Sequence, residues 1–96
     1  MRVISRKKLR AFWEVHPEAR PPLENWFRVA RQAGWRSFTD VRATLNSADF
    51  VEGKVVFNVG GNKYRLIAAI HYNRQKLYIR HVLTHEEYSS GGWKHD

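Results

Sequence analysis

The side chains best suited to chemistry lie in the second half of this 96-residue chain, where basic residues alternate with apolar ones. Arg65 and Arg80 fall in two segments of strand-like pattern, and His85 and Tyr88 follow directly after the second segment. Arginine offers a planar, permanently charged fork that matches phosphate oxygens. Histidine and tyrosine can transfer protons or position a reacting group. These four residues together suit chemistry on a phosphodiester.

Other polar side chains are expected on the same surface as the two arginines. Asn58 is expected directly across from Arg65, and Lys54 and Lys63 are placed to hold flanking phosphates. Tyr78 can stack on a base of single-stranded RNA. The outward face of an antiparallel sheet is normally polar, so the same pattern is equally compatible with a solvated surface.

The strands that must carry these side chains are indicated by a change of hydrophobic period to two from Phe50 onward. The predicted strands span residues 55–59, 63–72 and 76–83, with turns at 60–62 and 73–75. Phe57 is expected opposite Leu66, which places Arg65 and Arg80 on neighbouring strands of one open surface. The expected inward residues are Val55, Phe57, Val59, Tyr64, Leu66, Ala68, Ile70, Leu77, Ile79 and Leu83.

The first half of the chain shows helical spacing of apolar residues. One helix follows a short strand at residues 3–4, is capped by Ser5 and ends at Pro17; a second begins near Pro21 and stops at Gly34. A third, short helix starts at a capping box formed by Ser37 and Asp40. Residues 84–96 are expected to form one helical turn and then a loose tail. The sequence therefore predicts one α+β domain, residues 1–96, with N-terminal helices packed on one face of a small antiparallel sheet.

The five histidines show no metal-binding spacing, so we assign no metal and no other cofactor. His16 is interpreted as a helix-end residue, and His81, which falls on the inward set, as a satisfied core histidine. The absence of cysteine fits a cytoplasmic protein, and no apolar run is long enough to span a membrane. The net charge of +8 favours a polyanionic partner.

Two motifs resemble a known protein family. Residues 56–66, VFNVGGNKYRL, are similar to the central hairpin of the HigB toxin family, and residues 78–88, YIRHVLTHEEY, have a similar Thr-His-x-x-Tyr ending. Residues 1–9 and the chain length also resemble the family, so the likeness covers nearly the whole chain. The combination of a GGN-x-x-R hairpin with a TH-x-x-Y ending at this spacing is fairly specific.

The resemblance implies a RelE-like fold and a toxin of a type II toxin–antitoxin system. It implies a metal-independent endoribonuclease that cleaves mRNA during translation on the ribosome and thereby inhibits growth. It also implies a HigA-like antitoxin partner with a helix-turn-helix domain. Carried over by the resemblance, the expected catalytic residues are Arg65, Arg80, His85 and Tyr88.

In the implied mechanism the 2′-OH of the RNA attacks the adjacent phosphorus and leaves a 2′,3′-cyclic phosphate and a free 5′-OH. Arg65 and Arg80 are expected to stabilise charge on the phosphoryl oxygens. His85 is expected to act as acid or base, and Tyr88 to position the nucleotide or share the proton transfer.

Two other classes of function fit the same residues. A non-catalytic RNA- or ribosome-binding protein would slow translation without producing new mRNA ends. A protein-binding domain that docks an acidic partner would bind RNA weakly and lose it at modest salt. DNA binding by this chain alone is disfavoured, because no helix combines a basic recognition surface with a turn.

Overall fold

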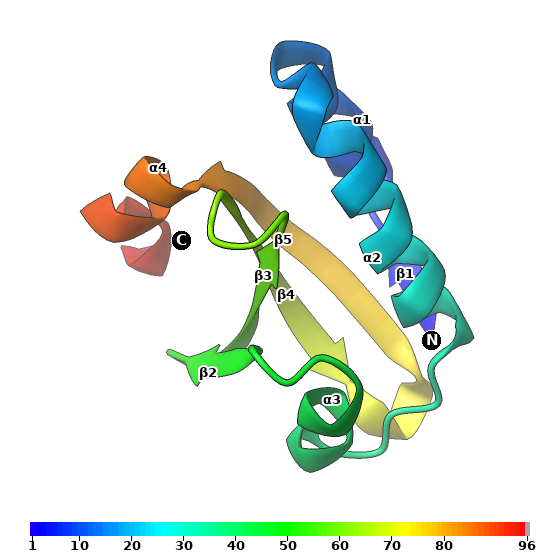
Figure 1. Ribbon diagram of the computed structural model, residues 1–96. Helices are drawn as coiled ribbons and strands as arrows, with labels where there is room; N and C mark the ends of the chain where they lie inside the picture. Colours follow the sequence, from blue (N-terminus) through cyan, green and yellow to red (C-terminus); the bar gives the residue numbers. More distant parts are fainter. Residues whose placement is uncertain (96) are drawn as a thin grey trace.

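The computed structural model describes residues 1–95 and consists of a five-stranded sheet with helices on both of its faces (Figure 1). The elements are β1 (Arg2–Ile4), α1 (Lys7–Val15), η1 (Pro17–Ala19), α2 (Arg20–Gln32), α3 (Phe38–Thr44), β2 (Asp49–Val51), β3 (Lys54–Val59), β4 (Tyr64–His71), η2 (Tyr72–Arg74), β5 (Lys76–Thr84), α4 (His85–Ser90) and η3 (Gly92–His95). This arrangement confirms the predicted α+β fold. Within residues 1–95, none of the helices combines the length and apolar character needed to cross a membrane.

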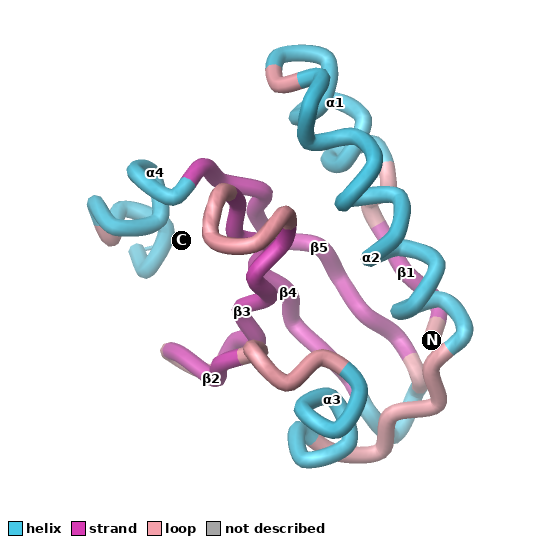
Figure 2. Tube along the Cα trace, in the orientation of Figure 1, coloured by secondary structure: helices cyan, strands magenta, loops and turns pink. Residues whose placement is uncertain are grey.

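The sheet has the strand order β1-β5-β4-β3-β2 (Figure 2). Strands β2 to β5 are antiparallel, and β1 pairs in parallel with the first part of β5. The register of the central hairpin is confirmed, with Phe57 opposite Leu66 and Asn58 opposite Arg65. The short strand β2 was not expected from the sequence.

The main core lies between α1, α2 and the inward face of the sheet. Phe57 of β3 is its centre: the Trp26 ring of α2 meets it edge-on with centroids 5.3 Å apart, and the Trp35 ring stacks on it at 6.1 Å. Leu23 and Ala30 of α2 are fully buried beside them. The aromatic residues thus let a short chain bury a large apolar area.

Two predicted helix caps differ from the structure. Ser5 does not cap α1: its backbone has φ 76°, and the cap position is Arg6, which makes no side-chain cap bond. The chain must turn from β1 into α1 within two residues, and Ser5 makes that turn with left-handed backbone. Ser37 does cap α3, with Oγ accepting from Asp40 N at 3.4 Å. The Asp40 carboxylate accepts from Arg36 N at 2.9 Å, which replaces the reciprocal bond to Ser37 expected of a capping box.

A β-bulge in β5 corrects the predicted register of the last strand. Ala68 pairs with Ile79 whereas Ile67 pairs with His81, which leaves Arg80 as the extra residue. One inserted residue reverses the side to which all following side chains point. Consequently His81 and Leu83 do not lie on the inward face, and Val82, predicted to face outward, packs against the main core.

The outward face of the sheet is not the open surface predicted from the sequence. Val56 and Ile67 on that face are buried together with Trp93, and Val51, Leu83 and Tyr88 pack around them. Residues 85–95 therefore form a covering layer of α4 and η3 in place of the loose tail expected after one helical turn. A tryptophan carries too much apolar surface to remain in solvent when an apolar sheet face is within reach.

Candidate active site

Three of the four predicted catalytic residues meet where β4 passes beneath α4. The Arg65 guanidinium is buried, with 8% of the residue exposed. Its Nη2 donates to His85 Nδ1 at 3.2 Å, and its Cζ lies 5.4 Å from the centre of the Tyr88 ring. The structure therefore brings together an arginine, a histidine and a tyrosine, which we call the Arg65–His85–Tyr88 cluster.

The position of His85 follows from the local structure of the β5–α4 junction. Thr84 caps α4 in a capping box: its Oγ1 accepts from Glu87 N at 3.2 Å, and Glu87 Oε1 accepts from Thr84 N at 2.9 Å. The backbone N–H of His85 donates to the Lys63 carbonyl at 2.9 Å. These bonds hold the first turn of α4 against the start of β4, directly beside Arg65.

The contact with Arg65 determines which nitrogen of His85 faces the solvent as a donor. An arginine side chain can only donate, so Nδ1 of His85 accepts, and in the neutral ring Nε2 carries the hydrogen. His85 is exposed, whereas Arg65 beneath it is buried. The cluster thus offers an exposed N–H donor supported by a buried positive charge, which suits stabilisation of charge on a phosphoryl or leaving oxygen.

Tyr88 is held in a fixed orientation above Arg65. Its ring stacks on Trp93, with centroids 5.3 Å apart and an interplanar angle of 14°. Trp93 Nε1 donates to the Tyr88 carbonyl at 3.1 Å. Trp93 was not among the predicted site residues, although a tryptophan in an otherwise polar segment indicates that the segment packs on an apolar surface.

Arg80 is separate from the cluster. It lies at the bulge of β5, is exposed, and lines a groove of about 420 Å³ that also contains Lys8 and His16 of the α1 region. This groove, which we call the β5-edge groove, exists because β1 pairs with β5 only as far as Tyr78. Lys8 Nζ donates to the Arg80 carbonyl at 3.0 Å. At its other end the groove reaches Glu87 of α4.

The predicted RNA-binding residues divide into two groups. Asn58 and Lys63 lie beside the cluster, because Asn58 pairs with Arg65 and the Lys63 carbonyl holds His85. Lys54 begins β3, four residues from Asn58, or about 13 Å along the strand. Tyr78 pairs with Ala69, four residues from Arg65, and its ring meets that of His71 at 5.3 Å. Val56 and Ile67, which are buried beneath Trp93, lie between these two groups.

An ionisable pair tethers the helical layer to the strand that carries Arg65. Tyr64 Oη donates to Glu18 Oε1 at 2.8 Å. Hydrogen bonds from the Glu18 backbone and from Tyr64 lower the pKa of the Glu18 carboxyl. Burial, followed by the bond to Glu18, raises the pKa of the Tyr64 hydroxyl. Within residues 1–95, no group of three or more His, Asp or Glu side chains is arranged to hold a metal ion.

Comparison with known proteins identifies the family. The HigB toxin family, described as the RelE-like toxic component of a toxin–antitoxin system, matches residues 19–91. The chain belongs to this family. The mRNA interferase toxin HigB of Escherichia coli is 32% identical over 91 residues, covering 92% of this chain and 88% of that relative. An mRNA interferase HigB of Shigella flexneri matches with the same identity and coverage, and one of Escherichia coli O6:H1 is 24% identical.

The HigB family match bears on the candidate site in two ways. The matched residues 19–91 include the whole Arg65–His85–Tyr88 cluster and Arg80, whereas Lys8 and His16 lie outside them. As the toxic component of a two-component system, this HigB-family chain has an antitoxin as its partner.

Proposed function

We propose that this HigB-family chain is an endoribonuclease toxin that cleaves mRNA at the Arg65–His85–Tyr88 cluster. The activity is supported by the relatives named mRNA interferase. The observation that supports the site is the bond from Arg65 Nη2 to His85 Nδ1 at 3.2 Å, because it joins a buried cation to an exposed donor. A phosphodiester is the substrate that this combination of charge and donor suits.

The proposed reaction uses the RNA's own 2′-OH as nucleophile, so it needs no metal-bound water. The 2′ oxygen attacks the adjacent phosphorus and the bond from phosphorus to O5′ breaks, which yields a 2′,3′-cyclic phosphate and a 5′-OH. The 2′-OH proton leaves to water, and water protonates O5′. His85 Nε2–H donates a hydrogen bond to the leaving oxygen, Arg65 stabilises the phosphoryl charge through space and positions His85, and Tyr88 positions the nucleotide.

The β5-edge groove is the proposed path of the RNA strand into the cluster. Lys8 and Arg80 supply positive charge along it, and it ends at α4, whose first residue is His85. Arg80 in this proposal binds a phosphate next to the cleaved one. Asn58 and Lys63 contact the RNA beside the cluster, whereas Lys54 and Tyr78 extend the contact at the other end of the sheet.

We further propose that the mRNA is cut while translated on the ribosome, in the cytoplasm, and that the antitoxin is a HigA-like helix-turn-helix protein. The net charge of +8 supports contact with a large polyanion such as the ribosome. Comparing cleavage of a purified mRNA with and without ribosomes tests the first part directly.

The central test is to induce the wild-type chain and a His85→Ala variant in a bacterium and to map mRNA 5′ ends within minutes. We expect new 5′-OH ends inside coding regions for the wild type, reduced roughly 100-fold or more in the variant. Arg36→Ala, at an exposed position outside the cluster and the β5-edge groove, is the control and should cut like the wild type. Growth arrest without new ends would instead indicate a non-catalytic RNA- or ribosome-binding protein.

A further inference from the structure

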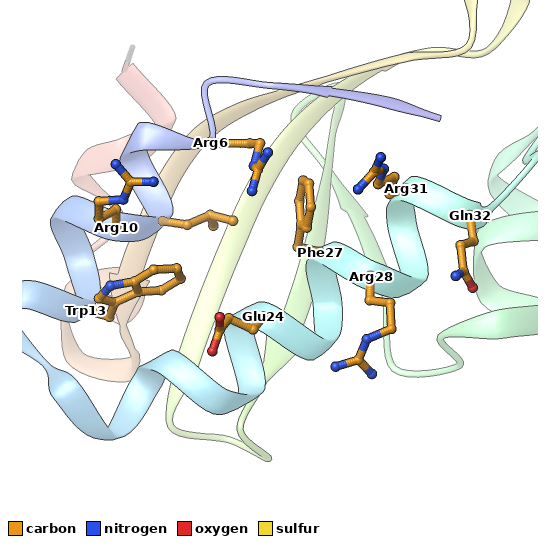
Figure 3. A pocket seen from close by; sticks show the side chains of 9 residues that line it. Arg6, Arg10, Trp13, Glu24, Phe27, Arg28, Arg31 and Gln32 are labelled. Atoms are coloured by element: carbon orange, nitrogen blue, oxygen red, sulfur yellow. The ribbon is translucent and has the colours of Figure 1, made fainter.

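The side of α1 that faces β5 carries a stripe of side chains along the β5-edge groove. Lys8, Phe12 and His16 follow one another at intervals of four residues, with Ala11 and Val15 beside them. Residues at this spacing share one face of a helix. Another side of α1 lines a separate groove with α2 (Figure 3), which shares none of the described lining residues of the β5-edge groove. Of the stripe, only Lys8 has a role in the proposed function.

The charged groups of the β5-edge groove differ between its two ends. At one end, Lys8 Nζ uses one of its three hydrogens for the Arg80 carbonyl, at 3.0 Å, and Arg80 is exposed. His16 lies about 12 Å further along α1. Carboxylates lie towards that end: Glu18 Oε1 is 3.9 Å from His16 Nδ1, and Glu87 belongs to the groove lining. A phosphate therefore suits the basic end, whereas a neutral group suits the His16 end.

The His16 ring is fixed in place by its neighbours. It stacks on the Phe12 ring, with centroids 4.6 Å apart and an interplanar angle of 28°. Phe12 in turn meets the Tyr64 ring of β4 edge-on at 5.5 Å. Even so, 32% of the His16 side chain is exposed, and 75% of Val15 beside it. A supported aromatic ring next to an exposed apolar side chain provides a surface on which a base can stack.

We propose that His16 and Val15 form a stacking surface for one unpaired base of the RNA, while Lys8 and Arg80 bind phosphates beside it. The inference rests on the proposed function, which takes the β5-edge groove as the path of the RNA, and it adds a base contact to that path. Because the ring is held before binding, little conformational entropy is lost when the base arrives. Stacking uses the face of the base, so the contact is tolerant of sequence.

The test compares two labelled strands by fluorescence anisotropy in the His85→Ala background, where RNA stays uncut. The first strand is a single-stranded RNA of about six nucleotides. The second strand has the same number of phosphates but a stable abasic sugar in place of every nucleotide. It therefore carries the charge of the RNA without its bases, and the comparison separates base contacts from phosphate contacts.

Three variants of His16 separate the ring from its charge. His16→Ala removes the ring, His16→Phe keeps a ring without the nitrogens, and His16→Lys replaces the ring by a cation. Phe50→Ala is the matched control, because it removes an exposed aromatic ring that packs on Phe38, outside the β5-edge groove. Arg80→Ala is the phosphate control. Urea unfolding verifies that each variant is folded.

We expect His16→Ala to weaken binding of the RNA about tenfold and binding of the abasic strand less than about twofold. His16→Phe should bind RNA like the parent protein, and His16→Lys should bind it as weakly as His16→Ala. Phe50→Ala should leave the binding of both strands unchanged. Arg80→Ala should weaken both by the same factor, because its partner is a phosphate.

Equal loss of the two strands in His16→Ala would overturn the proposal, as would unchanged RNA binding in that variant or full RNA binding by His16→Lys. RNA cutting is measured separately with His85 intact, with and without ribosomes. Base-dependent binding at His16 without any cutting would refute only the proposed function. Cutting together with equal loss of both strands would refute only the stacking surface.

Discussion

At the scale of single residues, Arg65 is the centre of the candidate site. Its Nη1 donates to the carbonyls of Asn62 and Tyr64, each at 3.1 Å, while Nη2 donates to His85. A buried charge is costly unless such bonds satisfy it. Three donated bonds also fix the guanidinium plane, so Arg65 positions His85 in addition to supplying charge beneath it.

Arg65→Lys tests this positioning role. A lysine keeps the charge but cannot donate to two carbonyls and a histidine in one plane. We expect RNA cutting to fall by about tenfold or more. Nδ1 of His85 is then released, so the other ring tautomer becomes accessible, and kcat should fall while KM changes little.

The measurement is kcat and KM on an RNA oligonucleotide, with urea unfolding as the check on folding. A variant with a higher KM and the wild-type kcat would show that Arg65 contributes charge to RNA binding and does not position His85. Wild-type rates throughout would remove Arg65 from the mechanism.

At the scale of elements, α4 and η3 have two functions that depend on each other. They carry His85 and Tyr88, and they bury the outward face of the sheet through Trp93, of which 5% is exposed. The site therefore exists only when this C-terminal layer is packed on β3 and β4.

Trp93→Ala should lower the free energy of unfolding by about 3–5 kcal/mol, because it leaves a cavity over Val56 and Ile67. The rate of RNA cleavage should also fall, because the Tyr88 ring loses the Trp93 ring on which it stacks. Urea unfolding and an RNA cleavage assay measure the two effects. Phe50→Ala is the control: Phe50 is 59% exposed, so the change should be below about 1 kcal/mol. A Trp93→Ala protein as stable as this control would contradict the packing.

The bond from Tyr64 to Glu18 attaches η1 to β4 and should make stability depend on pH in two windows. Glu18 has a lowered folded pKa, so its contribution is present above its unfolded pKa and is lost as the pH falls through the folded value. Tyr64 has a raised folded pKa, so its contribution is present below its unfolded pKa and is lost as the pH rises through the folded value.

Unfolding free energies measured by urea over a pH series should show both windows in the wild type. Glu18→Gln should flatten the acid side, and Tyr64→Phe should flatten the alkaline side and weaken the acid dependence. Parallel curves for the wild type and Tyr64→Phe across the whole range would show that the bond contributes nothing in solution.

At the scale of the whole molecule, basic side chains line two separate grooves of this chain, whose net charge is +8. One is the β5-edge groove with Lys8 and Arg80, which leads to the cluster. The other lies between α1 and α2 and is lined by Arg6, Arg10, Arg28 and Arg31. The RNA path proposed above uses only the first of these two grooves. Electrostatic attraction at each surface should be separable by mutation.

RNA binding should weaken steeply with salt, because each cation that neutralises a phosphate releases a counterion. Arg80→Ala in the His85→Ala background should reduce the slope of log K against log salt by about 0.7 for single-stranded RNA. With His85 intact, the same change should raise KM and leave kcat nearly unchanged. Arg36→Ala serves as the control and should keep the wild-type slope. A fall in kcat with an unchanged KM would instead show that Arg80 acts in the chemical step.

Local patterns in the sequence were sufficient to predict much of this molecule. The turn at residues 60–62 set the hairpin register, which put Asn58 opposite Arg65. The three N-terminal helices followed from apolar spacing, prolines and Ser37. His85 and Tyr88 were expected near Arg65, because a chain leaving β5 has few residues in which to move away.

The tertiary structure alone decided the position of Arg80 and the covering of the outward sheet face. The bulge has no signature in β5 itself: it arises where the strand leaves β1 and contacts α1 and α4, and it shifts every later side chain to the other face. Likewise, Trp93 meets Val56 and Ile67 across more than 25 residues of chain. Spacing along a chain predicts which local faces are apolar, but which distant segment covers a face depends on packing of the complete molecule.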